Sequence, residues 1–225
     1  MQFEKILKEN KFTLAVGLPA NDLDMVKAAI DGGADAVKFN LNLGGPFGSF
    51  SENKEFIEGT MKLCEGKILV GANMGNANAY VTPAERDLLE EMGIDFVECF
   101  ADCFPPFMLK SKKLSKLIAF HDEIDNLLDI IDESEVSVVE ASIVPHTEYG
   151  TAVRYFDLLR YRKITQAIKT PVLVPAQRSI LPEEVAALAE CGVKAVMIGA
   201  NVMTGKDAIS VRASTMAFKK CIDEL

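Results

Sequence analysis

Four titratable side chains interrupt segments of the sequence that are otherwise apolar and rich in β-forming residues: Lys38, Glu98, His121 and Glu140. Burying such a group without a partner costs several kcal/mol, so each must be hydrogen-bonded or paired with a charge. A structural ion pair would explain any one of them, but four on four separate segments are better explained as one cluster. A lysine beside carboxylates and a histidine can move protons and stabilise negative charge, so we predict that these four residues are catalytic.

Three kinds of reaction fit this set of residues. In an aldolase or related lyase, Lys38 would form a Schiff base, and burial in an apolar interior would lower its pKa enough for attack on a carbonyl group. In a cofactor-free isomerase or epimerase, a carboxylate would remove a proton next to a carbonyl while the charged Lys38 stabilises the enolate. In a metal-dependent enzyme, the two carboxylates and His121, with His146 as a further ligand, would bind zinc or manganese, although a lysine opposes a cation there.

A barrel that only binds a phosphorylated metabolite is the alternative from a different class. Binding alone seldom needs both a lysine and two buried acids in one pocket, so we expect an enzyme. We rank the aldolase or lyase first, with Lys38 as the Schiff-base or enolate-stabilising residue, and the isomerase or epimerase second. We rank the metal-dependent enzyme last, and we expect no cofactor.

The composition excludes several classes of partner. The chain of 225 residues has 33 acidic and 24 basic side chains, a formal net charge of −9, which disfavours binding to nucleic acid. No apolar run approaches the roughly 20 residues that a membrane span needs, and the N-terminus carries charge where a secretory signal would be apolar. We therefore expect a cytoplasmic protein whose partner is a small molecule, with a homo-oligomer left open.

Eight apolar runs alternate with segments whose apolar residues recur every three or four positions. We predict strands at Phe12–Leu18, Ala34–Leu41, Lys67–Ala72, Ile94–Ala101, Lys116–His121, Val136–Val144, Pro171–Pro175 and Lys194–Gly199. We predict helices at Asp22–Ile30, Glu52–Cys64, Pro83–Met92, Asp122–Ile131, Thr151–Ile168, Pro182–Glu190 and Asp207–Ile222, and a short or irregular crossover at Phe104–Lys113, which contains two prolines.

This alternation of strand and helix implies parallel strands joined by right-handed crossovers. Eight such strands close on themselves, so we predict an α/β fold, a single (β/α)8 barrel domain over residues 1–225. An open doubly wound sheet would need a glycine-rich nucleotide loop after the first strand, and the segment Leu18–Asp22 contains no glycine.

In a barrel of this kind the functional side chains gather where the strands end. Along the second strand, side chains alternate between two faces, with Val37 and Phe39 on one and Lys38 and Asn40 on the other. The apolar set should pack under the helices, which directs the lysine and the asparagine into the barrel. We therefore add Asn40 to the predicted substrate-binding residues.

The segment Val193–Asp207 reads as a strand that ends at Gly199, a turn of small residues and the start of a helix. Backbone N–H groups in such a turn, together with a helix N-terminus, form a site for an anion. This segment resembles the eighth strand and phosphate loop of the phosphate-binding (β/α)8 barrels, the ribulose-phosphate-binding type. The resemblance is strongest over Thr170–Leu225 and points to no individual member. It implies that Gly199, Ala200 and Asn201 bind the phosphate of a sugar or related carbonyl metabolite.

The turn after the seventh strand departs from that family. Its members usually carry a glycine-rich turn there, whereas the segment Val174–Glu184 of this chain has no glycine. Arg178 lies in this turn, and its guanidinium can contact a phosphate through two parallel hydrogen bonds. We therefore predict Arg178 as a phosphate-binding residue, with binding of a carboxylate or pairing with Glu140 as alternatives.

Overall fold

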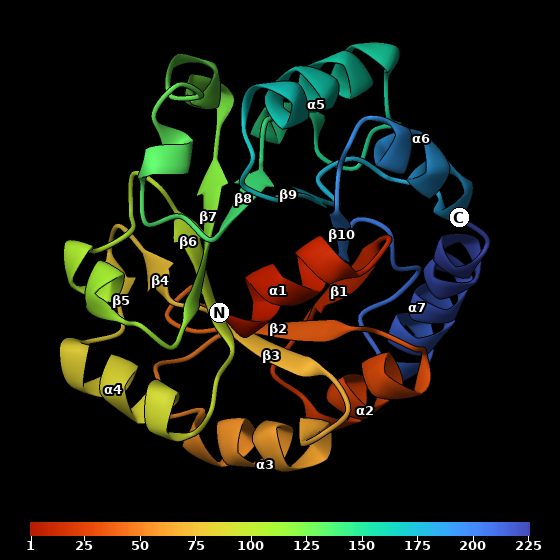
Figure 1. Ribbon diagram of the computed structural model, residues 1–225. Helices are drawn as coiled ribbons and strands as arrows, with labels where there is room; N and C mark the ends of the chain where they lie inside the picture. The colour runs from red at the N-terminus through yellow and green to blue at the C-terminus, as the bar shows by residue number, and fades with distance from the viewer.

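Eight parallel strands close into a barrel in the computed structural model, which describes residues 1–225 (Figure 1). The strands are β1 (Thr13–Gly17), β2 (Ala36–Asn40), β3 (Leu69–Asn73), β6 (Phe96–Phe100), β7 (Ser115–Phe120), β8 (Val138–Ala141), β9 (Val172–Pro175) and β10 (Ala195–Ile198). They follow one another around the barrel in this order, and β10 pairs with β1. The predicted (β/α)8 barrel and its eight predicted strands are therefore confirmed.

An outer ring of helices covers the barrel (Figure 1). Its members are α2 (Leu23–Asp31), α3 (Lys54–Cys64), α4 (Pro83–Glu91), α5 (Tyr155–Ala167), α6 (Val185–Glu190) and α7 (Ala208–Asp223). Side chains that accept backbone N–H bonds begin three of them: Asp22 for α2, Thr82 in a capping box with Glu85 for α4, and Asp207 for α7. No helix is both long enough and apolar enough to cross a membrane.

The helix predicted over Asp122–Ile131 is wrong. The chain there forms two short 3₁₀ turns, η2 (Asp122–Asn126) and η3 (Ile131–Glu133). Aspartate and asparagine, which are common in this segment, favour caps and turns over helix interiors, and only Ile124 and Ile131 are fully buried. The crossover between β6 and β7 contains one 3₁₀ turn, η1 (Pro106–Lys110), and so has the irregular form expected from its prolines.

An additional helix, α1 (Gln2–Glu9), closes the N-terminal end of the barrel (Figure 1). Its residues Phe3 and Leu7 are completely buried among the side chains that fill the barrel interior. The ring of Phe3 stacks on that of Phe96, with centroids 4.0 Å apart and planes inclined by 15°. A Cβ atom on Gly71 would lie 2.1 Å from the Phe96 ring, so glycine is required there for this stack to form.

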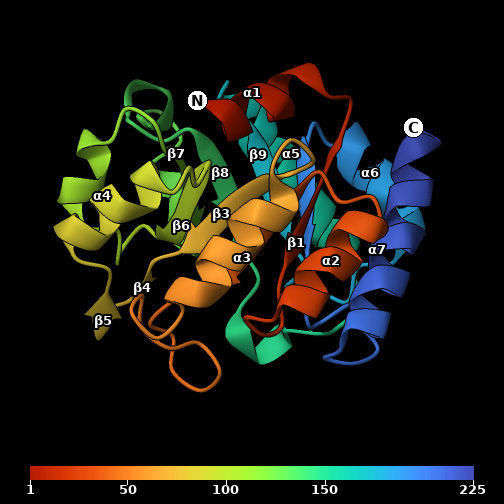
Figure 2. The same cartoon turned by 90° about the horizontal axis from the view of Figure 1, so that it is seen from below.

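The opposite end of the barrel, where the strands end, is bordered by loops and a short hairpin. In Figure 2, α1 lies at one end of the molecule, and the β4–β5 hairpin (Gly75–Asn76 and Ala79–Tyr80) lies toward the opposite end, with the loops that follow the strands. This hairpin was not predicted, because its strands of two residues each are too short to give a period-two pattern. Side chains at the carboxyl ends of the eight strands therefore face a different environment from those packed against α1.

Removing the Phe3 ring tests whether α1 holds the barrel closed. Phe3→Ala should lower the free energy of unfolding by about 3–5 kcal/mol, because it opens a cavity between α1 and the barrel. The matched control is Phe156→Ala, since Phe156 is 66% exposed and its loss should change stability by less than about 0.5 kcal/mol. Urea unfolding followed by circular dichroism measures both. Equal effects of the two substitutions would mean that α1 is not part of the folded core.

Candidate active site

The ammonium group of Lys38 lies inside the barrel and forms an ion pair with Glu98. Nζ of Lys38, on β2, is 2.7 Å from Oε2 of Glu98, on β6. The same oxygen accepts a hydrogen bond of 2.6 Å from Nδ2 of Asn73, on β3. Glu98 is only 2% exposed, so the lysine and the amide replace the water that its charge would otherwise need.

The surroundings of Lys38 stabilise its protonated form, so the expectation of a lowered pKa is wrong. Burial alone would lower the pKa of Lys38, but the charges of Glu98 and Glu140 and the hydrogen bond to Glu98 outweigh this effect. The pKa of Lys38 therefore lies above its ordinary value. An amine must lose its proton before it attacks a carbonyl, so this environment favours the charged, enolate-stabilising form over a Schiff-base nucleophile.

Glu140, on β8, completes the charged group inside the barrel. Its Oε1 accepts a hydrogen bond of 2.8 Å from Oγ of Ser142, whereas its buried Oε2 has no hydrogen-bond partner in the protein. Burial and the negative charge of Glu98 raise the pKa of Glu140 to about 7, although the charge of Lys38 and the bond from Ser142 oppose the shift. A carboxyl group with this pKa can accept and return a proton near neutral pH.

Lys38 and Glu140 both reach a cavity of about 250 Å³ at the carboxyl ends of the strands. Its other lining residues come from β1, β6, β8, β9, β10 and the loops after them: Gly17, Phe100, Ser142, Tyr149, Pro175, Ala176, Gln177, Met197, Ile198, Gly199, Ala200 and Asn201. Glu98 lies behind Lys38 and does not line the cavity. A substrate in this cavity would therefore meet one ammonium group and one carboxyl group.

The predicted phosphate loop lines the same cavity as the charged residues. The backbone N–H groups of Gly199, Ala200 and Asn201 donate no hydrogen bond within the protein. The side chain of Asn201 donates to the carbonyl oxygens of Ala176 and Gln177, at 3.0 and 3.2 Å, which fixes the loop after β10 against the loop after β9. Three consecutive free N–H groups in a fixed turn are suited to an anion.

Asn40 and His121, which were also predicted for the site, lie outside this cavity. Asn40 directs its amide toward the carbonyl oxygen of Leu18, at 3.4 Å, and its backbone N–H donates to Asn21. His121 is exposed and stacks on Phe100, with ring centroids 4.2 Å apart and planes inclined by 14°. The structure therefore brings together Lys38, Glu98 and Glu140, but not His121 or Asn40.

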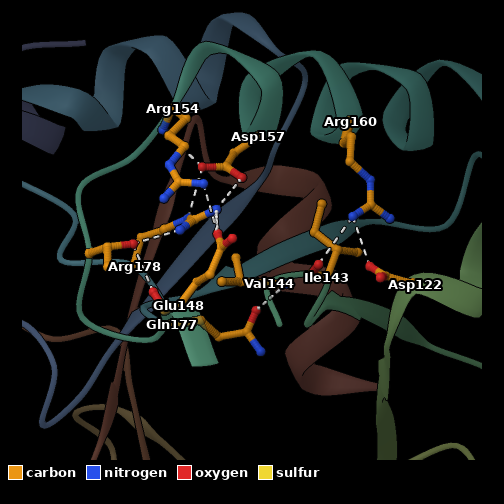
Figure 3. A network of polar contacts seen from close by, with 10 residues as sticks. Asp122, Ile143, Val144, Glu148, Arg154, Asp157, Arg160, Gln177 and Arg178 are labelled. Carbon is orange, nitrogen blue, oxygen red and sulfur yellow. Dashed lines mark hydrogen bonds and ion pairs between the residues drawn. The ribbon is translucent and has the colours of Figure 1, made fainter. Parts of the chain in front are cut away.

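Arg178 does not face the cavity, which contradicts its predicted contact with phosphate. Its Nε and Nη2 donate to both carboxylate oxygens of Asp157, each at 2.9 Å, and Nη2 is also 2.8 Å from Glu148 (Figure 3). Nη1 donates to Oγ1 of Thr151 at 2.6 Å. The guanidinium is thus occupied by two carboxylates that lie 21 and 30 residues earlier in the sequence, and neither of them is Glu140.

Tyr149 and Gln177 are cavity residues that the sequence analysis did not assign. Nε2 of Gln177 donates to the hydroxyl oxygen of Tyr149 at 2.5 Å, and Oε1 of Gln177 accepts from the backbone N–H of Val144 at 3.1 Å. Burial raises the pKa of Tyr149, so its hydroxyl keeps its proton at neutral pH. Tyr149 lies in the long loop after β8, where no periodicity indicates the direction of a side chain.

The structure does not bring together the ligands that the metal-dependent hypothesis requires. No three side chains of histidine, cysteine, aspartate or glutamate are gathered in a way that could hold a metal ion. His121 and His146 line a neighbouring pocket and do not join Glu98 and Glu140.

The largest cavity, about 740 Å³, lies at the opposite end of the barrel, beside α1. Two carboxylates in it have structural contacts: Asp35 accepts the backbone N–H of Leu14 at 2.8 Å, and Asp95 accepts that of Val70 at 2.9 Å. Both bonds hold the beginnings of neighbouring strands. We therefore place the candidate active site in the smaller cavity, at the end of the barrel where Lys38 and Glu140 meet.

Measurements of stability test the structural role of Arg178, which is to pair with Asp157 and Glu148. Arg178→Ala should lower the free energy of unfolding by about 3–5 kcal/mol, because it leaves the buried carboxylate of Asp157 without its partner. The control is Arg154→Ala, which removes a side chain that is 55% exposed and pairs with Glu148 at 3.0 Å, and it should cost at most about 1 kcal/mol. Chemical denaturation measures both. A cost for Arg178→Ala as small as that of the control would contradict the structural role.

Solved structures with the same fold have low sequence identity to this chain. Thiamine phosphate pyrophosphorylase from Pyrococcus furiosus is 19% identical, with 96% of this chain and 98% of that chain covered and a TM-score of 0.69. Phosphoribosyl anthranilate isomerase from Thermus thermophilus is 16% identical, with 93% and 99% covered and a TM-score of 0.64. Tryptophan synthase from M. tuberculosis is 14% identical, with 98% and 96% covered and a TM-score of 0.71.

The sequence itself matches no protein-family model and no curated protein. The likeness therefore lies in the three-dimensional arrangement and shows the fold alone. The chain has the (β/α)8 fold that these barrel enzymes share.

Proposed function

We propose that the protein is an enzyme that moves a proton next to the carbonyl group of a small phosphorylated sugar or related metabolite, through an enolate. The observation that carries this proposal is that Glu140, whose buried Oε2 has no hydrogen-bond partner, lines the same cavity as Lys38. The fold alone supports an enzyme in a general way, and the side chains of this cavity support the type of reaction.

In the proposed reaction the carboxylate of Glu140 removes a proton from the carbon beside the carbonyl. The C–H electron pair becomes the enolate double bond, and the carbonyl oxygen takes the negative charge. The ammonium of Lys38 stabilises that oxygen, because a fixed positive charge in a water-poor site interacts strongly with charge that develops during the reaction. Glu140 then returns the proton to the neighbouring carbon while the hydroxyl proton of that carbon passes to the first oxygen, which gives an isomerase. An epimerase requires in addition a second acid that protonates the original carbon from its opposite face.

The same enolate also forms when a C–C bond next to a carbonyl breaks, so a lyase remains compatible with these residues. A Schiff-base aldolase fits less well, because Glu98 and Glu140 keep the proton on Lys38. The proton-transfer enzyme, second in rank from the sequence, is therefore the function that we favour.

The proposed phosphate position is the loop Gly199–Asn201. This loop lines the cavity that contains Lys38 and Glu140, and its backbone N–H groups have no partner in the protein, so a phosphate bound to them would hold a short carbon chain near both side chains. Two of the structural neighbours are named for phosphorylated compounds, thiamine phosphate and phosphoribosyl anthranilate, which agrees with such a substrate.

Substitution of Lys38 separates enolate stabilisation from imine formation. With dihydroxyacetone phosphate and ribulose 5-phosphate in D₂O, we expect exchange of the hydrogen next to the carbonyl, measured by proton NMR. Lys38→Met should slow exchange by on the order of 100-fold, about 3 kcal/mol, whereas Lys38→Arg keeps the positive charge and should retain part of the rate. A complete loss in Lys38→Arg, with borohydride trapping of substrate on Lys38 of the wild type, would instead establish a Schiff base.

The pH dependence of the reaction tests Glu140. Because the carboxylate must be ionised to act as a base, kcat/KM should rise with pH through about 7, the pKa of Glu140. The bond from Ser142 lowers that pKa, so Ser142→Ala should move the rise to higher pH, and Glu140→Gln should abolish exchange. A rise that stays in place in Ser142→Ala, or activity that persists in Glu140→Gln, would mean that another group is the base.

A further inference from the structure

A second pocket adjoins the candidate active site and has no part in the chemistry proposed above. It has a volume of about 280 Å³ and is lined by Phe100, His121, Asp122, Glu123, Ser142, Ile143, Val144, Pro145, His146 and Tyr149. Three of these residues, Phe100, Ser142 and Tyr149, also line the cavity with Lys38 and Glu140. The two spaces are therefore neighbouring lobes that share a wall.

The volumes suggest that the two lobes bind one molecule. Pockets for small molecules usually measure about 300–1,000 Å³, and each lobe alone falls below that range. The combined volume of the two lobes lies within this range. A substrate that filled both lobes would place its reacting carbon near Glu140 and extend past Tyr149 into the second lobe.

Four of the ten residues that line the second lobe carry flat rings. Phe100 and His121 form a stacked pair, with centroids 4.2 Å apart, and His146 and Tyr149 form a tilted pair, with centroids 4.7 Å apart and planes inclined by 42°. The first pair comes from the ends of β6 and β7, and the second comes from the loop after β8. Ring faces and edges favour a planar partner that can stack on them or meet them edge to face.

The charges around this lobe disfavour an anion there. Asp122 and Glu123 both line it, and the only arginine close to Asp122 is already paired with it, Arg160 at 2.8 Å (Figure 3). Arg160 also donates to the carbonyl oxygen of Ile143 at 3.1 Å. No lysine or arginine lines this lobe to offset the charge of a phosphate or carboxylate group beside Asp122 and Glu123, so a neutral or weakly basic ring fits the lobe better.

We propose that this second lobe binds a planar aromatic or heteroaromatic ring that belongs to the substrate. The assignment rests on the proposed function, because it takes the reacting carbon to lie at Glu140 and the phosphate at Gly199–Asn201. The substrate class is then a phosphorylated carbon chain with a flat ring at its other end. In this arrangement His121 is a binding residue for the ring.

The test compares two small alcohols that differ mainly in planarity, benzyl alcohol and cyclohexylmethanol, by protein-observed NMR titration. The protein carries Lys38→Met, so the result does not depend on catalysis. We expect benzyl alcohol to bind about tenfold more tightly, and His121→Ala and His146→Ala each to reduce that preference severalfold. Phe156→Ala, which removes an exposed ring outside the lobe, is the control and should change nothing.

Inorganic phosphate, added to the same titration, should bind together with benzyl alcohol because the two occupy different lobes. Equal affinities for the two alcohols, no effect of either histidine substitution, or mutual exclusion of phosphate and benzyl alcohol would each overturn the assignment. The proposed function fails separately, through absence of hydrogen exchange in the active protein. A planar preference without exchange would keep the ring site and refute the proton transfer.

Discussion

One lysine inside the barrel, Lys38, is shared by two buried carboxyl groups and sets the charge balance around them. Lys38 offsets the charge of Glu98, to which it is bonded at 2.7 Å, and only part of the charge of Glu140. Because a second full negative charge has no cation of its own, Glu140 holds its proton up to about pH 7. The same imbalance keeps Lys38 charged. The barrel thus contains a cation, Lys38, and an acid with a raised pKa, Glu140. Both protonation states follow from burial and from the number of neighbouring charges.

The two ends of the barrel differ in what borders the interior: apolar packing at one end and a cavity at the other. At the N-terminal end, α1 closes the barrel with Phe3 stacked on Phe96, and apolar packing excludes water. At the carboxyl end, small residues line the cavity, among them Gly17 and Gly199. Side chains there would fill the space that a substrate needs. The packed end and the candidate active site therefore lie at opposite ends of the barrel, as is usual for barrels of parallel strands.

The barrel, and the position of Lys38, Glu98 and Glu140 in its interior, could be predicted from the sequence because both depend on short-range patterns. Apolar runs mark the strands, and alternation along a strand decides which side Lys38 faces. His121 follows the last residue of β7, where alternation no longer determines the direction of the side chain. Arg178 was misassigned because its partners, Asp157 and Glu148, lie 21 and 30 residues away, and no local pattern shows that the folded chain brings them together.

The position of Arg178 also explains how a loop without regular structure can carry site residues. Its guanidinium binds Glu148, next to Tyr149, and Thr151, while Asp157 anchors it to α5 (Figure 3). Backbone bonds from Gly150 to Gln177 and from Ser179 to Thr151, both 2.8 Å, join the same two loops. A residue that bound phosphate could not hold these carboxylates as well. In this chain the guanidinium thus fixes the loop that carries Tyr149, and the anion site that we propose consists of the backbone N–H groups after β10.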